Sequence, residues 1–248
     1  MRLLLWRAAF LGAALAAWEV IARPLNPVLY VAPSSVPGAV LRLLSQPDLP
    51  PLAEHLGITL RTIAAAYALA VVVGLGLGFV MGFWPLLAQA YEPIIAGLYA
   101  VPSVVWYPSL MLLFGLGPAS KVAFGFLLGF FPVVLAVLAG MQQTDRHLVT
   151  VARAMGASRW AIYWKVMLPA MAGTLASGLR SGLALSTVGV LAGELLGSRA
   201  GVGFLINHVY NLLRTPEYVA LAVLVAAVVL VIDVAAGRIE ARAKQWSG

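Results

Sequence analysis

The strongest constraint on the fold of this chain is a series of apolar segments, each long enough to cross a lipid bilayer. An α-helix rises 1.5 Å per residue, so about 20 apolar residues span the ~30 Å hydrocarbon core. We predict transmembrane helices in six segments: Leu3–Ala22, Leu56–Phe83, Glu92–Phe114, Pro118–Met141, Ala172–Leu196 and Glu217–Gly237. The chain is therefore predicted to be an all-α, polytopic membrane protein with six transmembrane helices.

The composition agrees with a membrane protein and argues against other classes. Of the 248 residues, 62% are hydrophobic and 10% are charged, whereas a soluble domain carries about 25% charged residues. The formal net charge is +7, but Lys and Arg lie at the ends of apolar segments and form no soluble basic face, so we predict no nucleic-acid partner. The chain contains no cysteine, which excludes disulfides and thiol chemistry.

The N-terminal quarter is predicted to form a separate unit. Leu3–Ala22 resembles a signal peptide, but five apolar segments follow it, so we predict an uncleaved membrane span. The proline-rich segment Arg23–Glu54 is expected outside the membrane, with one interfacial helix at Val36–Leu44. Residues 1–55 thus form a first helix plus an external segment, and residues 56–248 form a core of five transmembrane helices.

Glycines and prolines mark expected contacts and bends. Glycines spaced by four in the second span allow another helix to approach closely: Gly74, Gly78 and Gly82. Prolines are expected to kink the third and fourth spans: Pro102, Pro108 and Pro132. We expect a turn at Trp84–Tyr91, a loop at Gly197–Pro216 and a basic tail after Gly237.

The segment Thr144–Pro169, within a predicted loop at 142–171, is the one long charged stretch between spans. Six spans place it on the same side as both termini. That side holds nine Lys and Arg residues and the other side six, which predicts that the loop and both termini are cytoplasmic. Apolar residues share one face of a short helix that ends at Gly156, as expected of a surface that fills a groove on another protein: Leu148, Val151, Ala152 and Met155.

Motifs for catalysis or metal binding do not occur in the sequence. None of the three lysines stands in a Gly-Lys-Ser/Thr sequence, so the chain has no P-loop for ATP. His55, His147 and His208 lie on different segments without partners at metal-ligand spacing, and each is predicted to be a loop or interface residue. The chain is therefore not predicted to be an enzyme, and we expect no cofactor or metal bound to it.

The charged segment resembles the cytoplasmic EAA loop of the inner-membrane permeases of ATP-binding-cassette (ABC) importers. Gly156 is followed by nine residues, the aliphatic Val166, one residue, and Leu168-Pro169. The resemblance implies that this loop docks on an ATPase subunit, with the helix Thr150–Gly156 as the main contact. The residues that correspond to the docking loop are Thr150, Val151, Ala152, Arg153, Ala154, Met155, Gly156, Ala157, Ser158, Leu168 and Pro169.

Further pieces resemble one branch of these permeases, which transports nitrate, sulfonates, taurine and pyrimidine vitamin precursors. They are Pro33–Leu44, His55 with Thr59–Arg61, Val101-Pro102, Tyr107-Pro108, Phe114–Gly117, Phe130–Pro132, Gly178–Arg180, and Glu194 followed by Gly201–Gly203. Two departures stand out. The glutamate and first alanine of EAA are replaced by Thr150 and Val151, and Ser186-Thr187 stands where this branch often has an aromatic residue.

The resemblance implies the type I ABC importer permease fold and a defined set of partners. Two permease copies would form a homodimer in the bacterial inner membrane, in contact with lipid. Two ATPase subunits would use ATP and Mg²⁺, and a periplasmic or lipoprotein binding protein would deliver a small polar or anionic solute. The substrate would be sulfonate-, nitrate- or taurine-like, or a pyrimidine vitamin precursor.

A polar stripe along the fifth span suggests part of the path. Gly173, Arg180, Thr187 and Glu194 recur every seven residues and so stay on one helix face. One hypothesis is that the stripe lines the path at a two-fold interface, with Arg180 as a cationic step. The other is that Arg180 reaches lipid headgroups and Glu194 caps a loop. The predicted path residues are Pro102, Pro108, Arg180, Thr187 and Glu194.

The main alternative function is a self-sufficient secondary transporter or channel. Such a protein is expected to show inverted internal repeats or acidic residues in the middle of its spans. The sequence shows no repeat, and Glu19 and Asp233 are placed near predicted span ends. A membrane-embedded enzyme would be a third possibility, but it lacks a candidate site.

Overall fold

The computed structural model describes residues 2–26, 30–45 and 49–246, and all regular structure in these ranges is helical. Among the described residues, five helical stretches are long and apolar enough to cross a membrane, or six if a bent helix pair counts as one span. The five include the helices α1 (Arg2–Ala22), α3 (Leu52–Phe83), α6 (Pro118–Gln143), α10 (Ala172–Gly197) and α12 (Thr215–Trp246). The predicted all-α, polytopic fold is confirmed.

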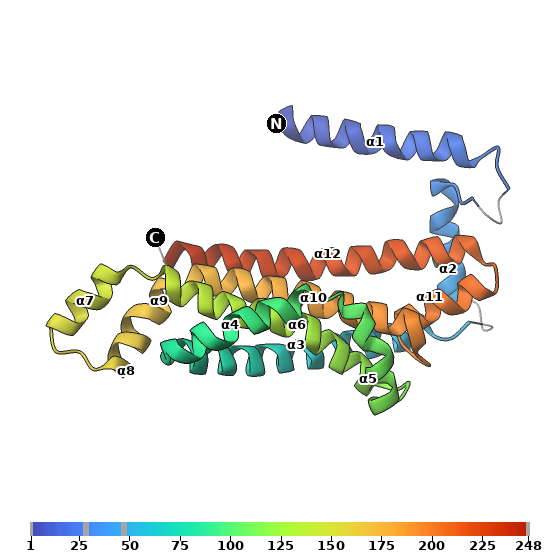
Figure 1. Ribbon diagram of the computed structural model, residues 1–248. Helices are drawn as coiled ribbons and strands as arrows, with labels where there is room; N and C mark the ends of the chain where they lie inside the picture. The colour runs from blue at the N-terminus through green and yellow to red at the C-terminus, as the bar shows by residue number, and fades with distance from the viewer. Residues whose placement is uncertain (1, 27–29, 46–48, 247–248) are drawn as a thin grey trace.

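The centre of the bundle is formed by α3, α6 and α10, which pack side by side (Figure 1). The glycines predicted to allow close approach lie at this contact. A Cβ atom on Gly78 of α3 would stand 2.7 Å from Cβ of Val137 on α6. Nearer the start of α6, Gly129 lies so close to Gly182 of α10 that neither glycine has room for a side chain. The small residues therefore bring the helix backbones together.

The third predicted span is a sharply bent pair of helices. The helix α4 (Pro85–Ala100) and the segment formed by the 3₁₀ helix η2 (Ser103–Trp106) and α5 (Tyr107–Phe114) meet at an angle of 86°. The turn expected at Trp84–Tyr91 is wrong, because Pro85 stands at the start of α4, where its missing N–H is tolerated. Pro102 lies at the bend, whereas Pro108 lies in the first turn of α5 and does not interrupt it.

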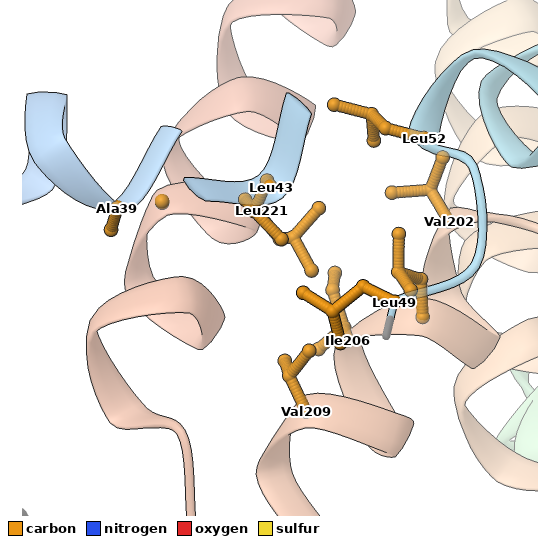
Figure 2. Packing of buried hydrophobic residues seen from close by; sticks show 10 residues of the cluster. Ala39, Leu43, Leu49, Leu52, Val202, Ile206, Val209 and Leu221 are labelled. Carbon is orange, nitrogen blue, oxygen red and sulfur yellow. The ribbon is translucent and has the colours of Figure 1, made fainter. Parts of the chain in front are cut away.

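One end of the bundle has its own hydrophobic core, shown in Figure 2. It joins α2 (Val36–Ser45), the start of α3, α11 (Val202–Asn211) and the start of α12. The buried residues are Ala39, Leu43, Leu49, Leu52, Val202, Leu205, Ile206, Val209, Ala220 and Leu221. The predicted interfacial helix matches α2, but the loop expected at Gly197–Pro216 is wrong, because it contains α11. The predicted domain boundary at 55/56 falls inside α3.

The opposite end of the bundle carries the charged segment as the short helices α7 (Arg146–Ala154) and α8 (Arg159–Ile162), which project beyond the long helices (Figure 1). The C-terminal end of α12 lies at this end too, and the N-terminal end of α1 points toward it. The tail expected after Gly237 is wrong, because α12 continues as a helix to Trp246. Pro132, which was expected to kink the fourth span, lies inside α6, and the helix continues past it to Gln143.

The tight contact between α3 and α6 generates a test with a matched control. We expect Gly78→Ala to lower the melting temperature of the purified protein by several degrees, because the added Cβ overlaps Val137, and overpacking typically costs about 1–3 kcal/mol. Gly76→Ala on the same helix meets no atom within 4 Å, and its better helix propensity makes it neutral or stabilising. Equal melting temperatures for the two variants, measured by fluorescence-detected size exclusion, would contradict this packing.

Candidate functional site

The charged segment is built as two short helices around a fixed corner. Asp145 caps α7 by accepting a hydrogen bond from the His147 N–H at 2.8 Å, and Ser158 caps α8 by accepting one from the Ala161 N–H at 3.2 Å. Gly156 has φ +81°, a conformation that side chains rarely adopt. The N–H groups of Gly156 and Ala157 each donate at 3.0 Å to carbonyls of the last turn of α7, which is the Schellman arrangement. The short helix predicted to end at Gly156 thus ends there, at a corner fixed by hydrogen bonds.

The outer side of α7 presents an apolar ridge, which we define as Leu148, Val151 and Met155. These side chains are 49%, 58% and 83% exposed, respectively. Ala152, predicted on the same face, is half-buried. A short helix that exposes its apolar residues, instead of packing them on its own bundle, is suited to fill a groove in a partner.

An aromatic cluster attaches the loop to the membrane helices. After α8 the chain forms the π-helix η3 (Tyr163–Met167), then α9 (Leu168–Ala170), with Pro169 in its first turn. The Tyr163 ring lies 5.8 Å, centroid to centroid, from both Phe79 and Phe83 on α3, and Trp160 lies 5.8 Å from Phe83. The sequence analysis missed this anchor, although the aromatic residues at 160, 163 and 164 could have indicated it.

Thr150 stands at the position that the resemblance to the EAA loop assigns to a glutamate, and its side chain forms a hydrogen bond within its own helix. Its Oγ1 donates to the Arg146 carbonyl oxygen at 2.8 Å. A threonine hydroxyl commonly makes this i to i−4 bond inside helices. The position therefore offers a partner a methyl group and no negative charge.

Arg180 on α10 is held by two carboxylates on α12. Its Nε and Nη2 donate to Oδ1 and Oδ2 of Asp233 at 2.9 and 2.7 Å, and its Nη1 donates to Oε2 of Glu240 at 2.8 Å. Ser177 also donates to Glu240, at 2.6 Å. Such bidentate pairing is the strongest form of an ion pair. The sequence analysis placed Asp233 near a span end and missed that it faces Arg180, because this depends on how α10 and α12 align.

Glu194 is buried near the opposite end of α10. Its carboxylate accepts hydrogen bonds from the Thr59 hydroxyl at 2.9 Å and from the Gly203 N–H at 2.9 Å. Thr59 in turn accepts from the Val202 N–H at 2.8 Å. Glu194 thus joins α3, α10 and the start of α11. Its hydrogen bond from Gly203 lies beside the loop between α10 and α11, where one hypothesis expected it to cap a loop.

Lys121 on α6, which the sequence analysis did not single out, is also buried at this end. Its Nζ donates to the carbonyl oxygens of Leu116 and Gly197 at 2.7 and 2.5 Å. A cavity of about 50 Å³ lined by Lys121 and Glu194 lies beside it. The buried Thr187 donates to the Leu183 carbonyl oxygen at 2.8 Å.

The structure does not bring the five predicted path residues into one cavity. Thr187 and Glu194 lie inside the bundle and Arg180 lies at the contact with α12, whereas Pro102 and Pro108 lie at the bend of α4 and α5. Within the described ranges, no group of three His, Asp or Glu side chains is arranged to hold a metal ion. His55 accepts a hydrogen bond at Nδ1 from the Gly201 N–H at 3.0 Å.

Comparison with known proteins yields a family and a fold. The family model "Binding-protein-dependent transport system inner membrane component" matches residues 70–245. The chain is 27% identical over 195 residues to the taurine transport system permease protein of Escherichia coli, covering 79% of this chain and 71% of that protein. It is 28% identical over 188 residues to the nitrate import permease protein of Leptolyngbya laminosa, covering 76% and 67%, respectively.

A solved structure of the MetNI methionine ABC transporter in inward-facing conformations contains a similar chain. The TM-score is 0.65 at 18% sequence identity, and the match covers 83% of this chain and 96% of that chain. At this identity the similarity concerns the fold.

The ion pairs of Arg180 predict a compensating double variant. We expect Arg180→Ala to reduce the yield of folded protein, because it leaves two carboxylates at the α10–α12 contact without their cation. Adding Asp233→Asn should restore part of that yield. Arg238→Ala, an exposed arginine on α12, serves as the control and should have no effect. If Arg180→Ala protein is as abundant and as stable as wild type, the pairing is not what holds α12 on α10.

Proposed function

The chain belongs to the binding-protein-dependent transport system inner membrane component family, and we propose that its α7–α8 loop is the surface on which the ATPase subunit of an ABC importer docks. As a member of this family it is the membrane permease subunit of such an importer, with the type I permease fold, and not an enzyme. ATP hydrolysis and substrate capture belong to partners, an ATPase subunit and a substrate-binding protein. ATP and Mg²⁺ are used by the ATPase.

The observation that carries the docking proposal is the apolar ridge of Leu148, Val151 and Met155. It is exposed on a helix that projects beyond the ends of the long helices (Figure 1). There a protein groove can remove it from water, and burial of apolar area is the main source of affinity between proteins. The proposed docking residues run from Thr150 to Ser158, with Leu168-Pro169 where the loop rejoins the membrane helices.

The loop is suited to transmit movement of the ATPase subunits. The Gly156 corner fixes α7 relative to α8, and the aromatic cluster of Trp160 and Tyr163 fixes α8 to α3. Motion of the docked ATPase would therefore reach α3 as the displacement of a nearly rigid body. The bend at Pro102 between α4 and α5 gives the bundle a place to adjust.

We further propose that the complete importer contains two copies of this chain and two ATPase subunits. The large apolar side chains that α5 leaves exposed, such as Leu112 and Leu113, support this proposal, because a second copy could cover them. The solute path would then run between the two copies, bordered by the α4–α5 pair. Lipid would cover the exposed apolar side chains of α1, such as Phe10 and Leu11.

The proposed orientation places the α7–α8 loop and both termini in the cytoplasm. Arg146, Arg153 and Arg159 lie on the loop, and Arg238 and Arg242 lie near the end of α12 at the same end of the bundle. This concentration of basic residues agrees with the positive-inside rule. The other end, with α2 and α11, would then face the binding protein.

The proposed substrate is a small polar or anionic solute. The two relatives described above are named for taurine, a sulfonate, and for nitrate, and pyrimidine vitamin precursors are a further possibility from the sequence resemblance. The proposal that Arg180 provides a cationic step along the path, with Pro102, Pro108, Thr187 and Glu194, requires the solute to replace Asp233 or Glu240 at the guanidinium. Since that exchange is demanding, we favour a role for Arg180 in fixing α12.

Docking through the ridge predicts loss of ATPase capture when the ridge becomes charged. Met155→Asp should abolish co-purification with the importer's ATPase subunit, because the aspartate would be buried in an apolar groove without a partner. Met155→Leu should retain it. Gly156→Pro should also abolish capture, since proline cannot adopt φ +81°. Undiminished capture by Met155→Asp and Gly156→Pro would rule out this loop as the docking surface.

The substrate class can be tested with the substrate-binding protein of the importer. Calorimetric titration of the importer's purified binding protein with taurine, other sulfonates, nitrate and pyrimidine precursors should show binding to one of these groups. Uptake of the same solute in cells should then disappear in the Met155→Asp variant. Binding of none of these groups, with tight binding of an unrelated solute class such as a sugar, would reject the proposed class.

A further inference from the structure

A small pocket lies beneath the α7–α8 loop, on the side away from the apolar ridge. Its volume is about 160 Å³, and it is walled by the end of α3, the end of α6, α7, α8 and the π-helix. The lining residues are Gly82, Phe83, Pro85, Met141, Val149, Arg153, Arg159, Ile162, Tyr163 and Met167. Sites for drug-sized molecules are about 300 Å³ or more, so this pocket suits one side chain or a small ion, not a nucleotide.

Two arginines from different helices converge on the pocket. Arg153 comes from α7 and Arg159 from the first turn of α8. Within the described residues, neither guanidinium forms an ion pair or a side-chain hydrogen bond. By contrast, Arg180 and Arg42 are both matched by carboxylates. Two uncompensated cations at one pocket favour an anionic group.

The loop has no acidic side chain of its own to supply. Between Thr144 and Pro169 the sequence contains four Lys and Arg residues and a single acid, Asp145. That carboxylate caps the start of α7. Thr150 occupies the position that the resemblance to the EAA loop assigns to a glutamate, and it is neutral. A carboxylate that pairs with the two arginines would therefore have to come from outside this loop.

A further donor stands at the wall of the pocket. The Tyr163 side chain is buried, and its hydroxyl has no hydrogen-bond partner within the described residues. Burial raises the pKa of Tyr163 to about 12, and like any tyrosine it keeps its proton at neutral pH and can donate to an acceptor. A buried polar group without a partner is uncommon in folded proteins.

We propose that this pocket binds a carboxylate side chain of the ATPase subunit, held between Arg153 and Arg159. The inference rests on the proposed docking function and specifies its chemistry. In this contact the permease would supply the positive charges, through Arg153 and Arg159, and the ATPase the negative one. The apolar ridge would provide contact area, and the arginine pair would fix the position of the ATPase on the loop.

A protein carboxylate fits the site better than a lipid phosphate does. The helices α7 and α8 project beyond the end of the bundle (Figure 1), and α7 carries the exposed ridge on one side and Arg153 on another. A protein that covers the ridge and extends around α7 can also place an acidic side chain at the pocket.

The test measures binding of the importer's ATPase subunit to the permease in nanodiscs of uncharged phosphatidylcholine. Arg153→Gln and Arg159→Gln should each raise the Kd about tenfold or more, and the effect should shrink at high salt. Arg146→Gln is the matched control, because Arg146 is an exposed arginine of α7 that does not line the pocket, and its Kd should change less than twofold. All three arginines are exposed, so the variants are expected to fold.

The outcomes separate this inference from the docking proposal. If Met155→Asp abolishes binding while Arg153→Gln and Arg159→Gln behave like Arg146→Gln, the carboxylate inference is wrong and docking stands. If none of the variants weakens binding, docking on this loop is itself wrong. If the arginine effect occurs only in nanodiscs with anionic phosphatidylglycerol, the pocket binds a lipid headgroup and the inference fails.

A chemical readout identifies the partner group directly. In the Arg153→Lys variant, carbodiimide should form an amide cross-link between the new lysine and a carboxylate of the ATPase. The Arg146→Lys variant supplies the background. A cross-link no stronger than that background would count against a carboxylate at this site.

Discussion

The close contact of α3, α6 and α10 is the constraint on which the rest of the structure depends. Glycines remove side chains at the helix crossings, so that the backbones of the three helices lie near one another. In a membrane the hydrophobic effect does not drive helices together, and van der Waals contact at small residues replaces it. Every functional feature is attached to this trio: the loop through Phe79 and Phe83, the ion pairs through Arg180, and the outer end through Glu194.

The two ends of the bundle are built on different principles. The end with α2 and α11 buries polar groups, such as Glu194 and Lys121, that are satisfied by neighbouring backbone and hydroxyl groups, and it has its own hydrophobic core (Figure 2). At the loop end, the apolar ridge is exposed, and Arg153 and Arg159 form no ion pair within the described ranges. The buried polar groups of the first end are therefore satisfied within one chain, whereas the second end carries the surface that we propose binds the ATPase subunit.

Features that depend on residues close together in the sequence could be predicted from the sequence. Apolar length predicted the long helices, Gly156 predicted the end of the short helix α7, and the spacing from Gly156 to Pro169 indicated the family. What it missed depends on alignment between distant segments. Asp233 meets Arg180, and Thr59 meets Glu194, only because of the register of packed helices. The helix α11 was missed because it is only ten residues long and follows a glycine-rich turn, and a segment of that kind is typical of a loop.

The charges shared by α10 and α12 bear on how the chain enters the membrane during synthesis. Arg180 is made 53 residues before Asp233 and 60 before Glu240. A charge inside a membrane span is costly unless it is paired, so α10 carries that cost until the ribosome has produced most of α12. We therefore expect stable insertion of the two helices to be coupled. A chain that stops before residue 233 would leave α10 without its counter-charges and open to quality control, although the helix itself would be intact.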